Sequence, residues 1–444
     1  VAIGIFVKRT HEPSDDCAVR FAELYGSREE KYDWLTGHDV RSTAWTQVAV
    51  NRATCSFRPS ASATPLDYDV APTLPQAMPE HSLGVLTKRD RLVVGFTENE
   101  VLARVRRFAD AGRSDKAVAD EFRLKPADND RWDLRKARRA LESPDAALVR
   151  RVQYRCGDFR YYYDHEAVVA RRNVRVLRHL GDLQHPALLV GRQGGAASSG
   201  TWDVIWATTV ASDQNVFRRG GATVFPLRLR EDGLLAGDET WNVSQAFADY
   251  VTRRIGEQPA GIGEQLSRRE AGLRTSVHEA APGYIYGLLH SAAFRAAFAD
   301  QLRREFPRIP VVGGDSFFRL AEIGHRLLRV HLLDVEPAVT FPVTGNDLAD
   351  AARFALSGVD DLGYGTVAVN GRGQHFAHVH AAAWERTCGG SPVLESYLDA
   401  RRGRALVYEE IRGFQLLATA LDAERALIAD ADGIVTGMLT PGRD

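Results

Sequence analysis

The stretch GYIYGLLHSAAFR, residues 283–295, begins the helical part of a chain whose middle is rich in strand-like segments. Apolar side chains recur from here at the three- and four-residue spacing of an amphipathic helix, and Pro307 ends that helix. The apolar stripe consists of Ile285, Leu288, Leu289, Phe294, Phe298 and Leu302. Further helices are predicted near Asp315 and after Ser391, so residues 281–444 are interpreted as a helical C-terminal part.

Before this point the chain alternates short apolar runs with turns, which is typical of a mainly β module. The runs are VQYR, FRYYYD, ALLVGRQ, DVIWATT and TVFPLRL. Residues 151–280 are therefore predicted to be mainly β, and residues 81–150 to form a connecting strand and helices. The predicted fold class is α+β, with a mainly β central module followed by the helical C-terminal part.

The composition is that of an ordinary globular protein, with 44% hydrophobic and 26% charged residues in a chain of 444. No run approaches the roughly 18 uninterrupted apolar residues of a membrane span, and the N-terminus lacks the layout of a signal peptide. The four cysteines, at positions 17, 55, 156 and 388, form no CxxC pair, which argues against a zinc ribbon. We therefore expect a cytoplasmic protein with reduced cysteines.

The charge is unevenly distributed, although the formal net charge is only −1. Residues 131–178 contain 13 Lys/Arg against 6 Asp/Glu, and only 6 of the 57 basic residues of the chain are lysine. The rigid fork of arginine fits phosphates and guanine edges better than the point charge of lysine does. This pattern favours a nucleic-acid partner, although the arginine bias of a GC-rich genome would produce the same excess.

The segment FRYYYD contains the first candidates for contact with nucleic acid, namely Arg160, Tyr161 and Tyr163. Tyrosines beside an arginine can stack on bases or contact the sugar–phosphate backbone. Neighbouring residues of a strand face opposite ways, so Tyr161 and Tyr163 are predicted to share a face opposite Tyr162. The alternative is that at least one of these tyrosines faces the core.

Two further groups of candidates follow along the chain. Arg171, Arg175 and Arg178 are placed at helical spacing and would form a phosphate-facing stripe, or else a solvated helix face. Arg192 and Gln193 end an apolar strand and enter a glycine-rich loop. Arginine pairs with guanine and glutamine with adenine in the major groove, and a strand end gives such side chains a firm base.

Two local patterns suggest enzyme chemistry but lack essential residues. Alternation along a strand would place His378 and His380 on one face, near His375, as in some metal sites. No carboxylate follows at a matching spacing, and no HExxH motif occurs. The glycine-rich residues 191–200 lack the lysine of a P-loop and are better explained as a turn. A metal-dependent hydrolase using the three histidines, and a protein-interaction scaffold built on the C-terminal helices, remain as alternatives.

Several segments, taken in order, resemble the C-terminal part of the type ISP restriction-modification enzymes. The most specific is residues 283–295 with its continuation REFPRIP, which is similar to the family pattern YIYavLHsp.YR…dFPRIP. Other similar segments are FFRLAEIGHRLLRVHLL, YRCGDFRYYY, LVGRQ, VFPL, GGSPVLESYL and RRGR. The resemblance spans roughly 83–430, with two departures. Cys156-Gly157 replaces the usual Pro-Phe, and Lys88 stands where the family commonly has asparagine.

The resemblance implies a function in reading double-stranded DNA. The chain would be the specificity part of an enzyme that methylates adenine N6 with S-adenosylmethionine and restricts unmodified DNA with ATP and Mg²⁺. Residues 1–80 would be the C-terminal remnant of the methyltransferase domain, and its opening VAIGIFVKRT would be a buried strand. The other partners would be the methyltransferase, helicase and nuclease domains, which we expect upstream in the same polypeptide.

Two motifs of adenine methyltransferases are missing from the sequence. The chain contains neither the S-adenosylmethionine loop nor the Asn-Pro-Pro-aromatic motif. We therefore expect the chain as given to bind no cofactor and to lack methyltransferase activity. The sequence predicts no catalytic residue and no metal ligand, and it leaves open whether the chain is an enzyme.

Overall fold

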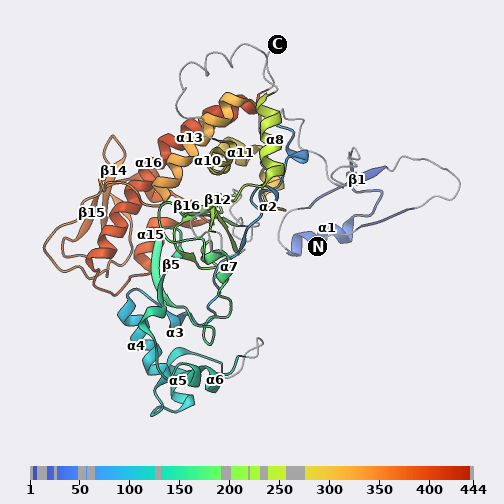
Figure 1. Cartoon of the computed structure of the whole chain (residues 1–444). Helices are drawn as coiled ribbons and strands as arrows, with labels where there is room; N and C mark the ends of the chain where they lie inside the picture. Colours follow the sequence, from blue (N-terminus) through green and yellow to red (C-terminus); the bar gives the residue numbers. More distant parts are fainter. Residues whose placement is uncertain are drawn as a thin grey trace. The chain divides into compact units, whose positions relative to one another are not determined.

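The computed structural model of this chain describes two compact units (Figure 1). The first unit consists of Val1–Ala71 together with Thr440–Asp444, and the second unit consists of Pro72–Leu439. The described residues are 4–7, 18–24, 28–48, 57, 66–125, 132–191, 202–218, 221–230, 239–256 and 276–440. Within these ranges, no helix combines the length and the apolar character that crossing a membrane requires.

The first unit contains one helix and a small antiparallel sheet. These elements are α1 (Arg28–Gly37), β1 (Val19–Phe21) and β2 (Thr46–Val48). Residues 4–7 of the opening stretch are not in a strand, and Phe6 and Val7 are 85% and 78% exposed. The predicted buried strand is therefore wrong for these four residues, because no described strand pairs with them. Residues 1–3 and 8–10 lie outside the described part of the chain.

The central part of the second unit contains, among the described residues, two sheets of four strands each. The first is antiparallel and has the order β3 (Ser82–Leu83), β10 (Ala222–Pro226), β7 (Ala187–Gly191), β8 (Ile205–Thr208). The second has the order β4 (Val94–Gly95), β6 (Asp158–Tyr163), β5 (Val149–Arg155), β9 (Ala211–Ser212). A two-stranded ribbon, β11 (Arg228–Arg230) and β12 (Glu239–Trp241), follows. The predicted strands of the β module are thus confirmed, and the fold is α+β.

The helices before the β module are α2 (Leu74–Ala77), α3 (Asp90–Val93), α4 (Glu98–Ala109), α5 (Asp115–Phe122) and α6 (Leu134–Ala140). Helices α3 and α4 contact the second sheet, α6 packs against α4 and α5, and α2 contacts α8 (Gln245–Gly256). The Thr97 side chain accepts a hydrogen bond from the Glu100 amide and so begins α4, whose side chains Val101, Val105 and Phe108 are buried. The strand predicted at residues 91–96 is wrong for its first half, because Asp90–Val93 form a helical turn.

The C-terminal part of the second unit is mainly helical, as predicted. Its helices are α8 (Gln245–Gly256), α10 (Val277–His290), α11 (Ala292–Ala297), α12 (Ala299–Leu302), α13 (Gly314–His331), α14 (Ala381–Glu385), α15 (Val393–Asp399) and α16 (Tyr408–Leu439). The helix predicted from the opening stretch to Leu302 is interrupted, because Ser291 leaves the helical conformation and caps α11. The remaining strands are β13 (Leu356–Ser357), β14 (Tyr364–Ala368), β15 (His375–His380), β16 (Thr387–Cys388) and β17 (Ser391–Pro392).

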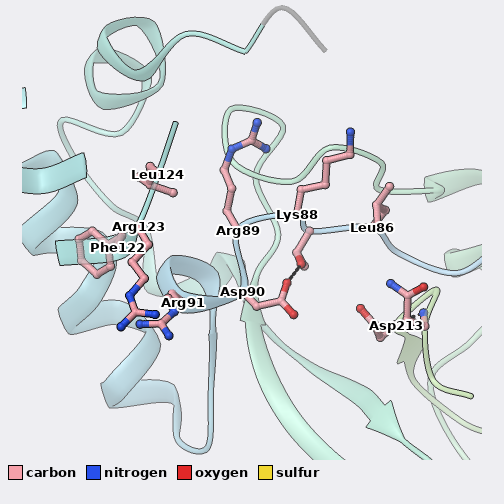
Figure 2. A pocket seen from close by; sticks show the side chains of 11 residues that line it. Leu86, Lys88, Arg89, Asp90, Arg91, Phe122, Arg123, Leu124 and Asp213 are labelled. Carbon is pink, nitrogen blue, oxygen red and sulfur yellow. Dashed lines mark hydrogen bonds between the residues drawn. The ribbon is translucent and has the colours of Figure 1, made fainter. Parts of the chain in front are cut away.

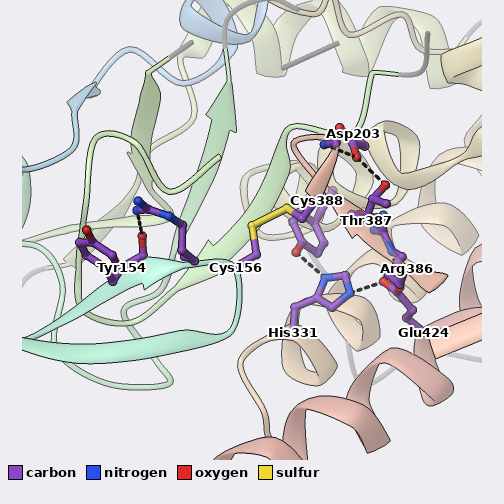
Figure 3. Close-up of a disulfide and its surroundings, with 11 residues drawn as sticks. Tyr154, Cys156, Asp203, His331, Arg386, Thr387, Cys388 and Glu424 are labelled. Atoms are coloured by element: carbon purple, nitrogen blue, oxygen red, sulfur yellow. Dashed lines mark hydrogen bonds and ion pairs between the residues drawn. A yellow bond between two sulfur atoms is a disulfide. The ribbon is translucent and has the colours of Figure 1, made fainter. Parts of the chain in front are cut away.

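A disulfide joins the β module to the C-terminal part. Cys156 lies between β5 and β6, and its partner Cys388, which is 232 residues away in the sequence, ends β16 (Figure 3). Both cysteines are buried, and their Cα atoms are 6.6 Å apart. The expectation of reduced cysteines is therefore wrong for this pair, because separation along the chain does not determine separation in space.

Loss of this disulfide is expected to lower the free energy of unfolding by about 2–4 kcal/mol, since the cross-link restricts the unfolded chain. Urea unfolding of the wild type with and without dithiothreitol measures the effect. The double variant Cys156→Ser/Cys388→Ser should unfold like the reduced wild type and should not respond to the reductant. A wild type whose midpoint ignores dithiothreitol would contradict the prediction.

Candidate nucleic-acid interface

A short segment at residues 84–86 joins the two four-stranded sheets. Its first residue, Gly84, donates a backbone hydrogen bond to the carbonyl of Ala222 in β10 (3.0 Å). The segment then forms β-bridges to Asp213, directly after β9, and to Arg171. Backbone hydrogen bonds therefore hold Arg171 and Asp213 at the join between the sheets.

Arg171 is linked from this join to the end of β7. Its Nη1 donates to Oε1 of Gln214 (3.3 Å), and the Gln214 carbonyl accepts from the amide of Ala222 (2.7 Å). Ala222 pairs with Gly191, the last residue of β7. The predicted pair Arg192-Gln193 follows directly but lies outside the described residues. The structure thus brings Arg171 close to the strand end from which that pair extends.

The predicted stripe of Arg171, Arg175 and Arg178 falls on and around a helix of one turn, α7 (Val174–Leu177). Asn173 adopts the left-handed conformation, with a φ of 52°, and so interrupts the backbone before that turn. The predicted helical stripe is therefore wrong, although Arg171, Arg175 and Arg178 are all exposed. Arg175 forms an ion pair with Glu80 (3.0 Å), which orients its guanidinium group at the surface.

Arg160 is placed inside the protein by its contacts. Its Nε and Nη2 donate to Oδ2 of Asp158 at 3.0 and 2.9 Å, and its guanidinium group stacks over the rings of Tyr154 (4.1 Å) and Phe96 (4.5 Å). The side chain is only 15% exposed. These contacts connect β6 to the residues before α4, so Arg160 acts as a packing residue.

The tyrosines of β6 are also largely covered. Tyr162 and Tyr163 are 0% and 1% exposed, and the Tyr163 hydroxyl accepts a hydrogen bond from the amide of Asp145 (3.0 Å). Tyr161 is partly buried and packs against the core around α4. Tyr163 therefore has no surface to offer a base, and Tyr161 has only part of one.

A pocket that the sequence analysis did not identify opens beside the same join (Figure 2). Its volume is about 480 Å³, and its walls are residues 86–91, 122–124, 213 and 215. The charged side chains among them are Lys88, Arg89, Arg91, Arg123, Asp90 and Asp213. Cations therefore outnumber carboxylates in this pocket. The charged run TKRD at residues 87–90 was the sequence signal that could have pointed to it.

The two carboxylates of the pocket are engaged with the protein. Asp90 accepts hydrogen bonds from the hydroxyl groups of Thr87 and Tyr154, the latter at 2.7 Å. Asp213 lies 3.4 Å from Nη1 of Arg155. Burial raises the pKa of Asp213 to about 6, an effect that Arg155 opposes and Asp90 reinforces. Asp213 therefore stays mostly ionised at neutral pH, and its negative charge is reduced only as the pH falls toward 6.

The three histidines of β15 do not converge on one point. His375 hydrogen-bonds the carbonyl of Gly373 through Nδ1 (2.8 Å), and the His378 ring stacks on Tyr364 at 4.0 Å. His380 instead accepts a hydrogen bond from a backbone amide. Among the described residues, these histidines are not part of any group spaced to hold a metal ion.

The second unit also matches a family of known proteins. The model of the family described as "Type ISP C-terminal specificity domain" matches residues 76–416, which is more than half of the chain. The chain belongs to this family. The match contains the join, the pocket and the strand end after which Arg192 and Gln193 follow. No curated protein matches the chain.

Solved structures share the fold of this specificity domain at low identity. A nuclease-deletion mutant of the Type ISP restriction-modification enzyme LlaGI, in complex with a DNA substrate mimic, is 18% identical with a TM-score of 0.57. A DrdV–DNA complex is 18% identical with a TM-score of 0.60, and the ATP-dependent Type ISP enzyme LlaBIII bound to DNA is 15% identical at 0.58. The alignments cover 94%, 94% and 87% of this chain, but only 33%, 42% and 26% of those proteins.

Proposed function

We propose that this chain recognises a specific sequence in double-stranded DNA as the specificity part of a restriction-modification enzyme. The observation that carries the proposal is the connected arrangement of Arg171, Gln214 and the end of β7, within a domain of the Type ISP specificity family. Exposed arginines beside a strand end provide phosphate contacts next to side chains that can reach base edges. The similar proteins LlaGI, DrdV and LlaBIII, which were solved with DNA or a DNA mimic, support the same use of the fold.

The activity of the intact enzyme belongs to the same proposal. Its methyltransferase would modify adenine N6 with S-adenosylmethionine, after the target base has been flipped from the duplex. ATP and Mg²⁺ would drive restriction, as the description of LlaBIII as ATP-dependent suggests. The proposed location is the cytoplasm.

Substitution of exposed arginines is expected to separate general affinity from sequence preference. Arg171→Gln and Arg175→Gln should weaken binding to all duplexes alike and lower the slope of log K against log [salt] by about 1 each. Arg192→Ala and Gln193→Ala should instead change which sequence is preferred. Each lost bidentate contact should lower the discrimination between the preferred base and another base by about 1–3 kcal/mol. Fluorescence anisotropy with duplexes selected from a randomised library measures both effects.

The matched control for this experiment is Arg326→Gln, which removes an exposed arginine from α13. This variant should bind like the wild type. A wild type that shows no salt-sensitive binding to any duplex would overturn the proposed function and favour a protein-interaction scaffold. Unchanged affinity and unchanged preference in all four variants would show that these residues are not the interface.

A further inference from the structure

We propose that the pocket formed by residues 86–91, 122–124, 213 and 215 binds a phosphate group, and that in the DNA complex this group is a phosphate of the backbone. The pocket has a volume of about 480 Å³, which is ample for a phosphate and its neighbouring sugar. The proposal extends the interface beyond the residues identified from the sequence. Its DNA part rests on the proposed function, and its phosphate part does not.

Two cations of the pocket are available for a ligand. In the described part of the chain, the side chains of Arg91 and Arg123 make no hydrogen bond, ion pair or ring contact with the protein. Both are exposed, and Figure 2 shows their guanidinium groups on the same side of the pocket. An arginine without a carboxylate partner keeps its donors free for the oxygens of a phosphate. The pocket therefore offers donors that the fold itself does not use.

The backbone supports the same conclusion at two positions. Lys88 and Arg123 have φ values of 57° and 53°, which place both in the left-handed region. A side chain with a long stem gains nothing from this conformation, whereas asparagine and glycine adopt it readily. Arg123 adopts this conformation as the residue that ends α5, so asparagine or glycine would fit both positions without strain, and both positions line one pocket.

The carboxylates of the pocket do not cancel these cations. Asp90 is held by the hydroxyl groups of Thr87 and Tyr154, and Asp213 is held by Arg155 and by the amide of Asn215 (2.8 Å). Both carboxylates are thus turned toward protein donors. They fix the wall of the pocket, while the exposed cations determine its charge.

The position of the pocket selects the backbone of DNA as the source of the phosphate. Asp213 and Asn215 line the pocket, and Gln214 between them accepts the hydrogen bond from Arg171. The pocket and the proposed interface therefore share one loop. A duplex in contact with Arg171 would bring phosphates of its backbone close to Lys88.

The test uses variants that remove charge without harming the fold. Lys88→Asn and Arg123→Asn relieve a left-handed lysine and arginine, so their thermal midpoints should equal or exceed that of the wild type. Arg91→Gln removes the third cation, and Arg326→Gln is again the control. Two probes are used on each protein: inorganic phosphate in a thermal-shift assay at constant ionic strength, and duplex DNA in an anisotropy titration against salt.

Phosphate should raise the thermal midpoint of the wild type and of Arg326→Gln, and the rise should be lost in the triple variant Lys88→Asn/Arg91→Gln/Arg123→Asn. The triple variant should also show a slope of log K against log [salt] that is smaller by about 1, as expected for one lost phosphate contact. Methylphosphonate substitution at a single position of the duplex should weaken the wild type and leave the triple variant unchanged.

The outcomes separate the two proposals. A lost phosphate response with unchanged DNA binding would support a phosphate pocket and exclude the DNA backbone as its source. An intact phosphate response together with an unchanged salt slope would overturn the pocket proposal and leave the proposed function standing. A wild type that binds no DNA would overturn the proposed function, and the response to phosphate would then decide on the pocket alone.

Discussion

Gly324→Ala is expected to break the packing of α10 against α13 and to destabilise the helical C-terminal part severely. A Cβ atom at position 324 would lie 1.8 Å from the carbonyl oxygen of Gly283 and 2.7 Å from the amide nitrogen of Gly287. Both atoms belong to the backbone of α10, so no side-chain rotation can relieve the clash. The two helices would have to separate, which exposes Tyr284, a side chain that is fully buried here.

The expected cost of this substitution exceeds about 3 kcal/mol, at or beyond the upper end of ordinary overpacking in a core. The matched control is Gly433→Ala in α16, where nothing lies within 4 Å of the new Cβ atom. This variant should be stabilised by about 0.5–1 kcal/mol, because alanine favours a helix interior over glycine. Urea unfolding followed by circular dichroism measures both variants, and equal midpoints for the two would contradict the prediction.

The same pair of helices indicates how much of this fold is readable from the sequence. The apolar stripe after Gly283 predicted a helix because the three- and four-residue spacing of apolar side chains can be seen within one short stretch of sequence. The contact between Gly283 and Gly324 was not predicted, since two helices can pack on several faces and only tertiary packing selects one of them. Local elements were therefore predictable, and the partners of those elements were not.

The candidate site likewise contains residues whose setting could be predicted from the sequence and residues whose setting could not. Arg171 was identified as an exposed arginine, and exposure follows from a polar pattern. Arg160 was misjudged, although Asp158 two residues earlier on the same strand was a visible signal for an internal ion pair. The pocket was missed because the run TKRD indicates only local charge, whereas the positive φ at Lys88 and the approach of residues 122–124, 213 and 215 depend on tertiary structure.

A second large effect is expected at a buried ion pair that links α16 to the rest of the second unit. Glu424 Oε1 lies 2.6 Å from Nε of Arg386, and Oε2 lies 2.5 Å from Nε2 of His331 (Figure 3). The Tyr286 hydroxyl contacts the other nitrogen of His331 at 2.6 Å, and the ring of Trp206 in β8 stacks on that histidine. Helices α10 and α13 and the first sheet therefore meet at the His331 ring, which the Glu424 carboxylate links to α16.

Removal of this carboxylate leaves a buried guanidinium group without its counter-charge. Glu424→Gln keeps the volume of the side chain and is expected to cost about 3–5 kcal/mol, because the unpaired charge of Arg386 remains inside the protein. Arg386→Gln should have a comparable cost, because the negative charge of Glu424 then remains inside the protein without Arg386 beside it. The double variant should cost less than the sum of the two, since it removes both charges together.

The dependence on pH gives the same pair an independent signature. Burial alone would raise the pKa of Glu424, but Arg386 and His331 hold it well below its ordinary value of 4.5. A carboxyl group whose pKa is lowered by folding stabilises the native state fully above its unfolded pKa, and that stability is lost as the pH falls toward the folded pKa. The difference between the wild type and Glu424→Gln should therefore be largest above about pH 5 and should shrink in acid.

Urea unfolding of the wild type, the two single variants and the double variant at pH 7 measures the coupling between Glu424 and Arg386. A coupling free energy of about 1–3 kcal/mol is expected for a buried pair in direct contact. Repetition at pH 4 should reduce it, because the Glu424 carboxyl group of the unfolded chain, with an ordinary pKa of 4.5, is then largely protonated while that of the native state is still ionised. Strictly additive costs at pH 7 would mean that the two charges do not stabilise one another, and the meeting of the three helices would then depend on apolar packing alone.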